Sequence, residues 1–140
     1  MAKTTAALKR LPRAWVELIE QPPDAAAFRR ALEATDLLLL PYQAEVYRRR
    51  SSGLLVQAMA LGIPTVVPEE TWLAAKAPAG AHVTFGVGIV LAQAVQSAID
   101  NYPMLVAKAR ESELTAWETL TARILVEKLI ETCRQSHVSR

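Results

Sequence analysis

The residues of this chain that could do chemistry stand together in one short polar stretch. Three arginines are followed without a gap by a serine- and glycine-containing segment: Arg48, Arg49, Arg50, Ser51, Ser52, Gly53 and Leu54. Guanidinium groups make paired hydrogen bonds with phosphate. The start of a helix also favours phosphate, through unpaired backbone N–H groups and the positive end of the helix dipole. The stretch therefore predicts a phosphate site, although serine at a helix start commonly serves as a simple N-cap and exposed arginines commonly just face solvent.

The apolar segments on either side predict the elements that would position this stretch. Asp36 leads into a continuous run of leucines, 37–40, which is typical of a strand buried on both faces of a parallel sheet. A nearly all-apolar helix follows the serines and stops at Gly62, and residues 65–67 form the next buried strand. This order places the helix N-terminus at the carboxyl end of the first strand, where folds of this kind bind ligands.

Other polar and aromatic residues are placed to line the same site. Gln57 is the strongly polar residue of an otherwise apolar helix, so it either faces a ligand cleft or has a buried partner. Tyr42 and Tyr47 could stack on a base or a sugar, or simply pack at the rim. Polar residues also follow the second strand: Glu69, Glu70 and Thr71. These three either line the pocket or form a charged surface turn.

The remaining segments predict an α/β chain with a parallel sheet. Asp24 is placed to cap a helix, and a short strand is expected over 15–19. The other expected elements are a basic helix over 3–11, a mainly irregular region at 69–88 with a short strand at 82–85, and three final helices at 89–100, from Pro103, and at 114–133. This alternation predicts one doubly wound, Rossmann-like domain over residues 1–140 with C-terminal helices.

Composition narrows the classes of function. The 140 residues are 51% hydrophobic and 21% charged, which indicates a globular chain, and a net charge of +2 is too small to argue for nucleic acid or an anionic membrane. Cys133 is the only cysteine, which excludes an internal disulfide and favours a reducing, cytoplasmic location. No apolar run approaches the ~20 residues of a membrane span. His82 and His137 lack neighbouring ligands, so no metal is expected.

Several motifs of the central region resemble one enzyme family. They are the strand from Asp36 to Pro41, the Ser-Gly helix start, Gln57-Ala58-Met59-Ala60, and Leu61-Gly62-Ile63-Pro64 before the second strand. Over about residues 14–130 the chain resembles the C-terminal, nucleotide-sugar-binding half of GT-B glycosyltransferases of the retaining type (group 1, family 4). The resemblance implies a truncated GT-B C-terminal domain in which Ser52, Gly53 and Leu54 hold the diphosphate of the donor. It also implies a nucleoside-diphosphate sugar as donor substrate, without a further cofactor.

Two positions depart from the family pattern. Gln57 stands where the family carries the glutamate that binds the ribose, and Arg49 stands where a second glutamate contacts the donor sugar. Gln57 can still hydrogen-bond a diol, and Arg49 could meet a phosphate instead. Some relatives carry a Tyr-x-x-Arg-x-Ser-Gly version of this loop, and four residues match it: Tyr47, Arg50, Ser52 and Gly53.

The resemblance covers only part of a full enzyme, so no catalytic residue is assigned. We expect glycosyl transfer only when another chain, either a second polypeptide or a further copy of this one, supplies the acceptor domain. The alternative is a non-catalytic remnant or protein-interaction module that keeps the fold. Two strands of the family's sheet normally lie between those expected at 15–20 and 36–41. Their absence would leave a bare sheet edge, which favours association.

Overall fold

The structure is a computed structural model of the chain. It describes residues 9, 12, 14, 16, 17, 19, 21 and 23–120, with residues 114–120 described by their backbone alone. The chain divides into two compact units, Met1–Ala34 and Thr35–Arg140. The candidate site lies wholly within the second unit.

The described part of the first unit contains one helix, α2 (Ala25–Glu33). Its N-cap is Asp24, whose carboxylate accepts a hydrogen bond from the N–H of Ala27 at 2.7 Å, as the sequence predicts. Of the strand expected over 15–19, the described residues 16, 17 and 19 are not in a strand, and residues 15 and 18 lie outside the described part. The helix expected over 3–11 also lies outside it, except for Lys9, which is in a turn.

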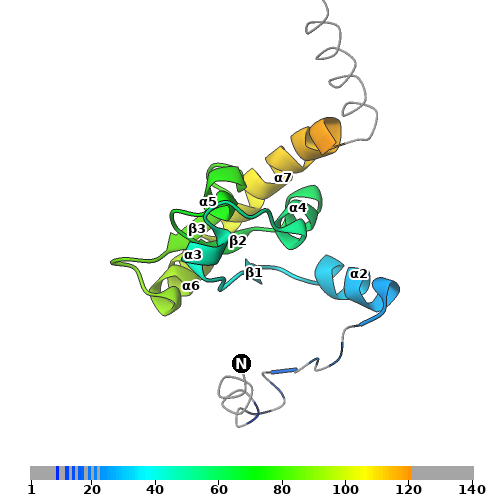
Figure 1. Ribbon diagram of the computed structural model, residues 1–140. Helices are drawn as coiled ribbons and strands as arrows, with labels where there is room; N and C mark the ends of the chain where they lie inside the picture. Colours follow the sequence, from blue (N-terminus) through cyan, green and yellow to red (C-terminus); the bar gives the residue numbers. More distant parts are fainter. Residues whose placement is uncertain are drawn as a thin grey trace, which may run out of the picture. The chain divides into compact units, whose positions relative to one another are not determined.

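The second unit is built on a three-stranded parallel sheet in the order β1 (Leu38–Leu39), β2 (Thr65–Pro68), β3 (His82–Phe85). Leu38 pairs with Thr65 and Thr65 pairs with His82, so the three strands start level with one another. Figure 1 shows them side by side. The α/β class and the parallel sheet are as predicted. In the described part of the chain β1 pairs only with β2, so it forms one edge of this sheet.

Helices connect the strands and complete the second unit. They are α3 (Ala44–Tyr47), α4 (Gly53–Ala60), α5 (Trp72–Lys76), α6 (Leu91–Asp100) and α7 (Tyr102–Leu120). None of the helices in the described residues is both long and apolar enough to cross a membrane.

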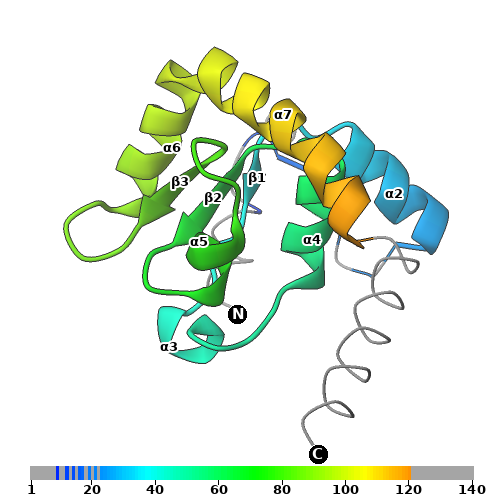
Figure 2. The ribbon, with the colours of Figure 1, turned by 90° about the horizontal axis from the view of Figure 1, so that it is seen from above.

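The two faces of the sheet carry separate hydrophobic clusters. Val67 of β2 packs on one face with Leu55 of α4 and Leu73 of α5. Its neighbour Val66 points to the opposite face and packs with residues of α6 and α7: Ala94, Ala98 and Leu105. Figure 2 shows α6 and α7 on one side of the strands and α4 and α5 on the other. Alternation of side chains along a strand produces this arrangement, and it explains why β2 is apolar at consecutive positions.

The helix expected after the serines is confirmed at both ends. Ser52 is the N-cap of α4, and the helix ends before Gly62, which adopts a φ of +60°. The N–H of Gly62 donates to the carbonyl of Met59 at 3.2 Å, and the N–H of Ile63 donates to that of Ala58 at 2.9 Å. This pair of bonds is a Schellman motif, which a glycine in the left-handed region permits at low cost.

Three features of the second unit differ from the sequence-based expectation. The loop before the serines contains the single turn α3, and the region expected to be irregular contains α5, capped by Thr71. Both helices are too short for a hydrophobic period to be visible in the sequence. The helices expected from Pro103 and from residue 114 are one continuous helix as far as Leu120, because no proline or glycine interrupts the segment. The expected strand at 82–85 is confirmed as β3.

Candidate functional site

The carboxyl ends of the three parallel strands bring the expected site residues to one edge of the sheet. β1 is followed by Tyr42 and α3, β2 by residues 69–71, and β3 by a loop that begins at Gly86. α3 and the loop after β3 lie at the same end of the sheet in both ribbon views (Figures 1 and 2). This is the edge at which open parallel sheets bind ligands.

The N-terminus of α4 offers free backbone donors at this edge. The hydroxyl of Ser52 accepts a hydrogen bond from the N–H of Leu55 at 3.3 Å, and the carbonyl of Ser52 accepts one from Val56. Among the described residues, no group accepts from the N–H of Gly53 or Leu54. Gly53 is exposed, and a Cβ added there would meet no atom within 4 Å. The space beside the Cα atom of Gly53, the first residue of the helix, is therefore open.

The arginine triplet directly precedes this helix start, and all three side chains are exposed. Nη2 of Arg48 lies 3.5 Å from Oε2 of Glu70. For Arg49 and Arg50 there is no ion pair with any described residue. Two exposed guanidinium groups without an ion pair to a described residue therefore belong to the segment that leads into this helix start.

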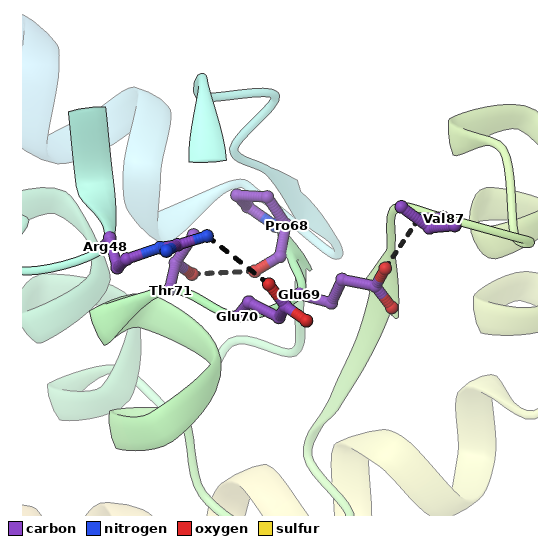
Figure 3. A network of polar contacts seen from close by, with 6 residues as sticks. All are labelled: Arg48, Pro68, Glu69, Glu70, Thr71 and Val87. Carbon is purple, nitrogen blue, oxygen red and sulfur yellow. Dashed lines mark hydrogen bonds and ion pairs between the residues drawn. The ribbon is translucent and has the colours of Figure 1, made fainter. Parts of the chain in front are cut away.

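The residues after β2 form a network of polar contacts (Figure 3). The hydroxyl of Thr71 is buried, where it donates to the carbonyl of Pro68 at 2.7 Å and accepts from the N–H of Ala74 at 3.3 Å. Both hydrogen bonds serve the turn and the cap of α5, so this hydroxyl has a structural role. Glu69 reaches the opposite way, and its Oε1 accepts a hydrogen bond from the N–H of Val87 at 2.5 Å.

The two tyrosines stack on each other. The ring centroids of Tyr42 and Tyr47 lie 4.2 Å apart with an interplanar angle of 25°. Both rings are half-buried against the hydrophobic cluster that contains Leu40, Leu55 and Val67. The stack fixes α3 over the end of β1, and thereby fixes the start of the arginine triplet.

Gln57 is exposed on α4, and its side-chain amide has no hydrogen bond to any described residue. Of the two possibilities left open by the sequence, a buried partner is excluded for this part of the chain. Gln57 lies four residues after Gly53, so the two share a face of the helix.

The described residues hold no group of three or more metal-ligating side chains. His82 is the first residue of β3, and its Nδ1 lies 2.9 Å from the carbonyl oxygen of Pro78 in the loop before that strand. The chemistry that the edge can support is binding of an anion through backbone N–H groups and guanidinium groups. The sequence signal for these donors is local and strong, whereas the contact of Arg48 with Glu70 joins residues too far apart in the chain to be predicted.

Comparisons of the chain with protein-family models, with curated proteins and with solved structures find no match. What is shown is an α/β unit with a three-stranded parallel sheet and helices on both of its faces.

Proposed function

We propose that the chain binds a nucleoside-diphosphate sugar and serves as the donor-binding half of a glycosyltransferase whose acceptor domain belongs to another chain. The observation that supports the proposal is the pair of N–H groups at Gly53 and Leu54, which donate to no described group and lie at the start of the helix that follows β1. Groups in this position are a ready site for a phosphate oxygen.

The neighbouring residues support a diphosphate in particular. Arg49 and Arg50 are exposed and precede Gly53 by four and three residues, so a ligand with two phosphates could use them and the helix N-terminus together. Gln57 lies one turn further along the same face of α4, where its amide can donate to and accept from the hydroxyls of a ribose. The arrangement favours a ligand in which a diphosphate and a diol are joined, as in a sugar nucleotide.

The chemical contribution of this chain is stabilisation of the leaving group. When the glycosyl bond to the diphosphate breaks, negative charge grows on the phosphate oxygen, and oriented N–H and guanidinium donors stabilise that charge. No acidic or basic side chain is assigned to proton transfer. Transfer of the sugar therefore requires groups from the chain that binds the acceptor.

Calorimetric titration with UDP, GDP and ADP and with their glucose conjugates tests the proposal. We expect binding that weakens as the salt concentration rises, because salt screens the attraction between charges. Binding should weaken further in the double variant R49Q/R50Q, because it lacks the guanidinium groups proposed to contact the phosphates, while the fold does not depend on them. Lys76→Gln removes an exposed positive charge on α5 and is the matched control. Absence of binding for all six ligands at millimolar concentration would refute the proposal.

A non-catalytic interaction module is the second candidate, and one observation favours it. Gln57 and Arg49 occupy the positions of the two glutamates that the resembled family uses for ribose and donor sugar. If Gln57→Glu leaves nucleotide affinity unchanged, the module is favoured. Sugar transfer by the isolated chain would exclude it.

A further inference from the structure

One residue next to the candidate site has an unusual backbone conformation. Glu70 has a φ of +54° and is the one non-glycine residue in the described part of the chain with a positive φ. This conformation is unfavourable for a residue with a Cβ atom, which comes close to the backbone, and it persists only where the surroundings impose it. The feature lies in the turn directly after β2, the central strand of the described sheet.

The surroundings impose it because the turn is held on both sides. On one side, the N–H of Glu69 donates to the carbonyl of Phe85 at 2.8 Å and the Glu69 carboxylate accepts from Val87. On the other side, Thr71 is tied to the carbonyl of Pro68 and caps α5. Figure 3 shows Glu70 between these two anchors, with its carboxylate directed at Arg48.

The contact that results is an ion pair in water. The distance between Arg48 Nη2 and Glu70 Oε2 is 3.5 Å, and the two side chains are 64% and 76% exposed. An ion pair of this kind is weak and is screened by salt. Either partner can therefore exchange the other for a stronger ligand without disturbing the hydrophobic core.

We propose that Glu70 is a built-in competitor for the anion site: its carboxylate occupies Arg48 in the free protein, and a phosphate of the ligand displaces it. This inference rests on the proposed function, since it takes the arginine triplet as part of the phosphate site. A diphosphate carries more charge than a carboxylate and offers more acceptor oxygens, so it prevails over Glu70 for the guanidinium. The exchange lowers the affinity of the site for every anion that has to displace Glu70.

Titration of UDP into Glu70→Gln tests the competition. We expect UDP to bind up to about fivefold more tightly than to the wild type, which is the upper end of the range that removal of one exposed ion pair gives. In a double-mutant cycle with Arg48→Gln, the gain should largely disappear, because no guanidinium is left to release. Glu111→Gln is the matched control, since it removes the carboxylate of an exposed ion pair with Lys108 that lies on α7.

Each outcome decides between the two proposals. If the wild type binds UDP and Glu70→Gln binds no better than Glu111→Gln, the competition is refuted and the proposed function stands. An equal gain with and without Arg48 also refutes it, because the effect would then be general repulsion by a negative charge. If no variant binds any of the six nucleotides and nucleotide sugars, both proposals fail. Glu70→Asn serves as a second variant, since asparagine tolerates a positive φ and equally lacks the carboxylate.

Discussion

Replacing Ser52 by alanine should destabilise the protein through the loss of a single hydrogen bond. Ser52 is 5% exposed, and its hydroxyl accepts from the N–H of Leu55, a residue that is fully buried. Loss of a serine N-cap costs about 0.5–2 kcal/mol, and a buried N–H without an acceptor costs about 1–3 kcal/mol. These two figures describe the same lost bond and are not added. We therefore expect Ser52→Ala to lower the free energy of unfolding by about 1–2 kcal/mol.

Urea denaturation followed by circular dichroism measures this change as a lower midpoint at an unchanged slope. Ser51→Ala is the internal control, because Ser51 is exposed and its hydroxyl has no hydrogen bond to a described residue. Ser52→Thr retains an acceptor and should recover most of the loss. If Ser52→Ala and Ser51→Ala unfold at the same urea concentration, Ser52 does not cap α4, and the account of the helix start is wrong.

Two further predictions concern the end of α4 and the start of α7. Gly62→Ala should lower the free energy of unfolding by about 1–2 kcal/mol in the same urea assay, because the residue needs a φ of +60° and its Cβ would lie 3.1 Å from an oxygen of Glu113. Gly53→Ala is the control: the space around its Cβ is open, so the free energy of unfolding should not change. Burial, then the charge of Asp36 and a hydrogen bond to it, raise the pKa of Tyr102. Because the folded-state pKa is the higher one, this stabilisation is fully present below about pH 10, the unfolded value, and is lost as the pH rises through the folded pKa. The melting temperature of the wild type should therefore fall more steeply above pH 10 than that of Tyr102→Phe, and equal slopes would contradict the assignment.

The parts of the fold that could be predicted depend on residues close together in the chain. Ser52 and Gly62 bound α4 because each acts on backbone groups within a few residues of itself. Asp24 does the same for α2. The short helices α3 and α5 could not be predicted, since one or two turns show no period and are stabilised mainly by packing against β1 and β2. The continuity of α7 is different, because the absence of proline and glycine between residues 104 and 120 is visible in the sequence.

The candidate site also has features that the sequence predicts and features that it does not predict. The arginines and the free N–H groups are neighbours along the chain, so their association follows from the order of the residues. The exposure of Gln57 could not be inferred in this way, because an apolar helix can turn a lone polar residue either outward or toward a buried partner. The stacking of Tyr42 on Tyr47 could not be distinguished from stacking on a ligand.

By itself, the sequence determined β1, α4 and β2 and the helix start at which a phosphate could bind. It did so because caps, glycine stops and apolar runs act over four residues or fewer. Only the tertiary structure decided that Glu70 faces Arg48 and that Glu69 holds the loop at Val87, contacts that span 22 and 18 residues of sequence. The register of three parallel strands sets those contacts, and register follows from burial on both faces of the sheet at once.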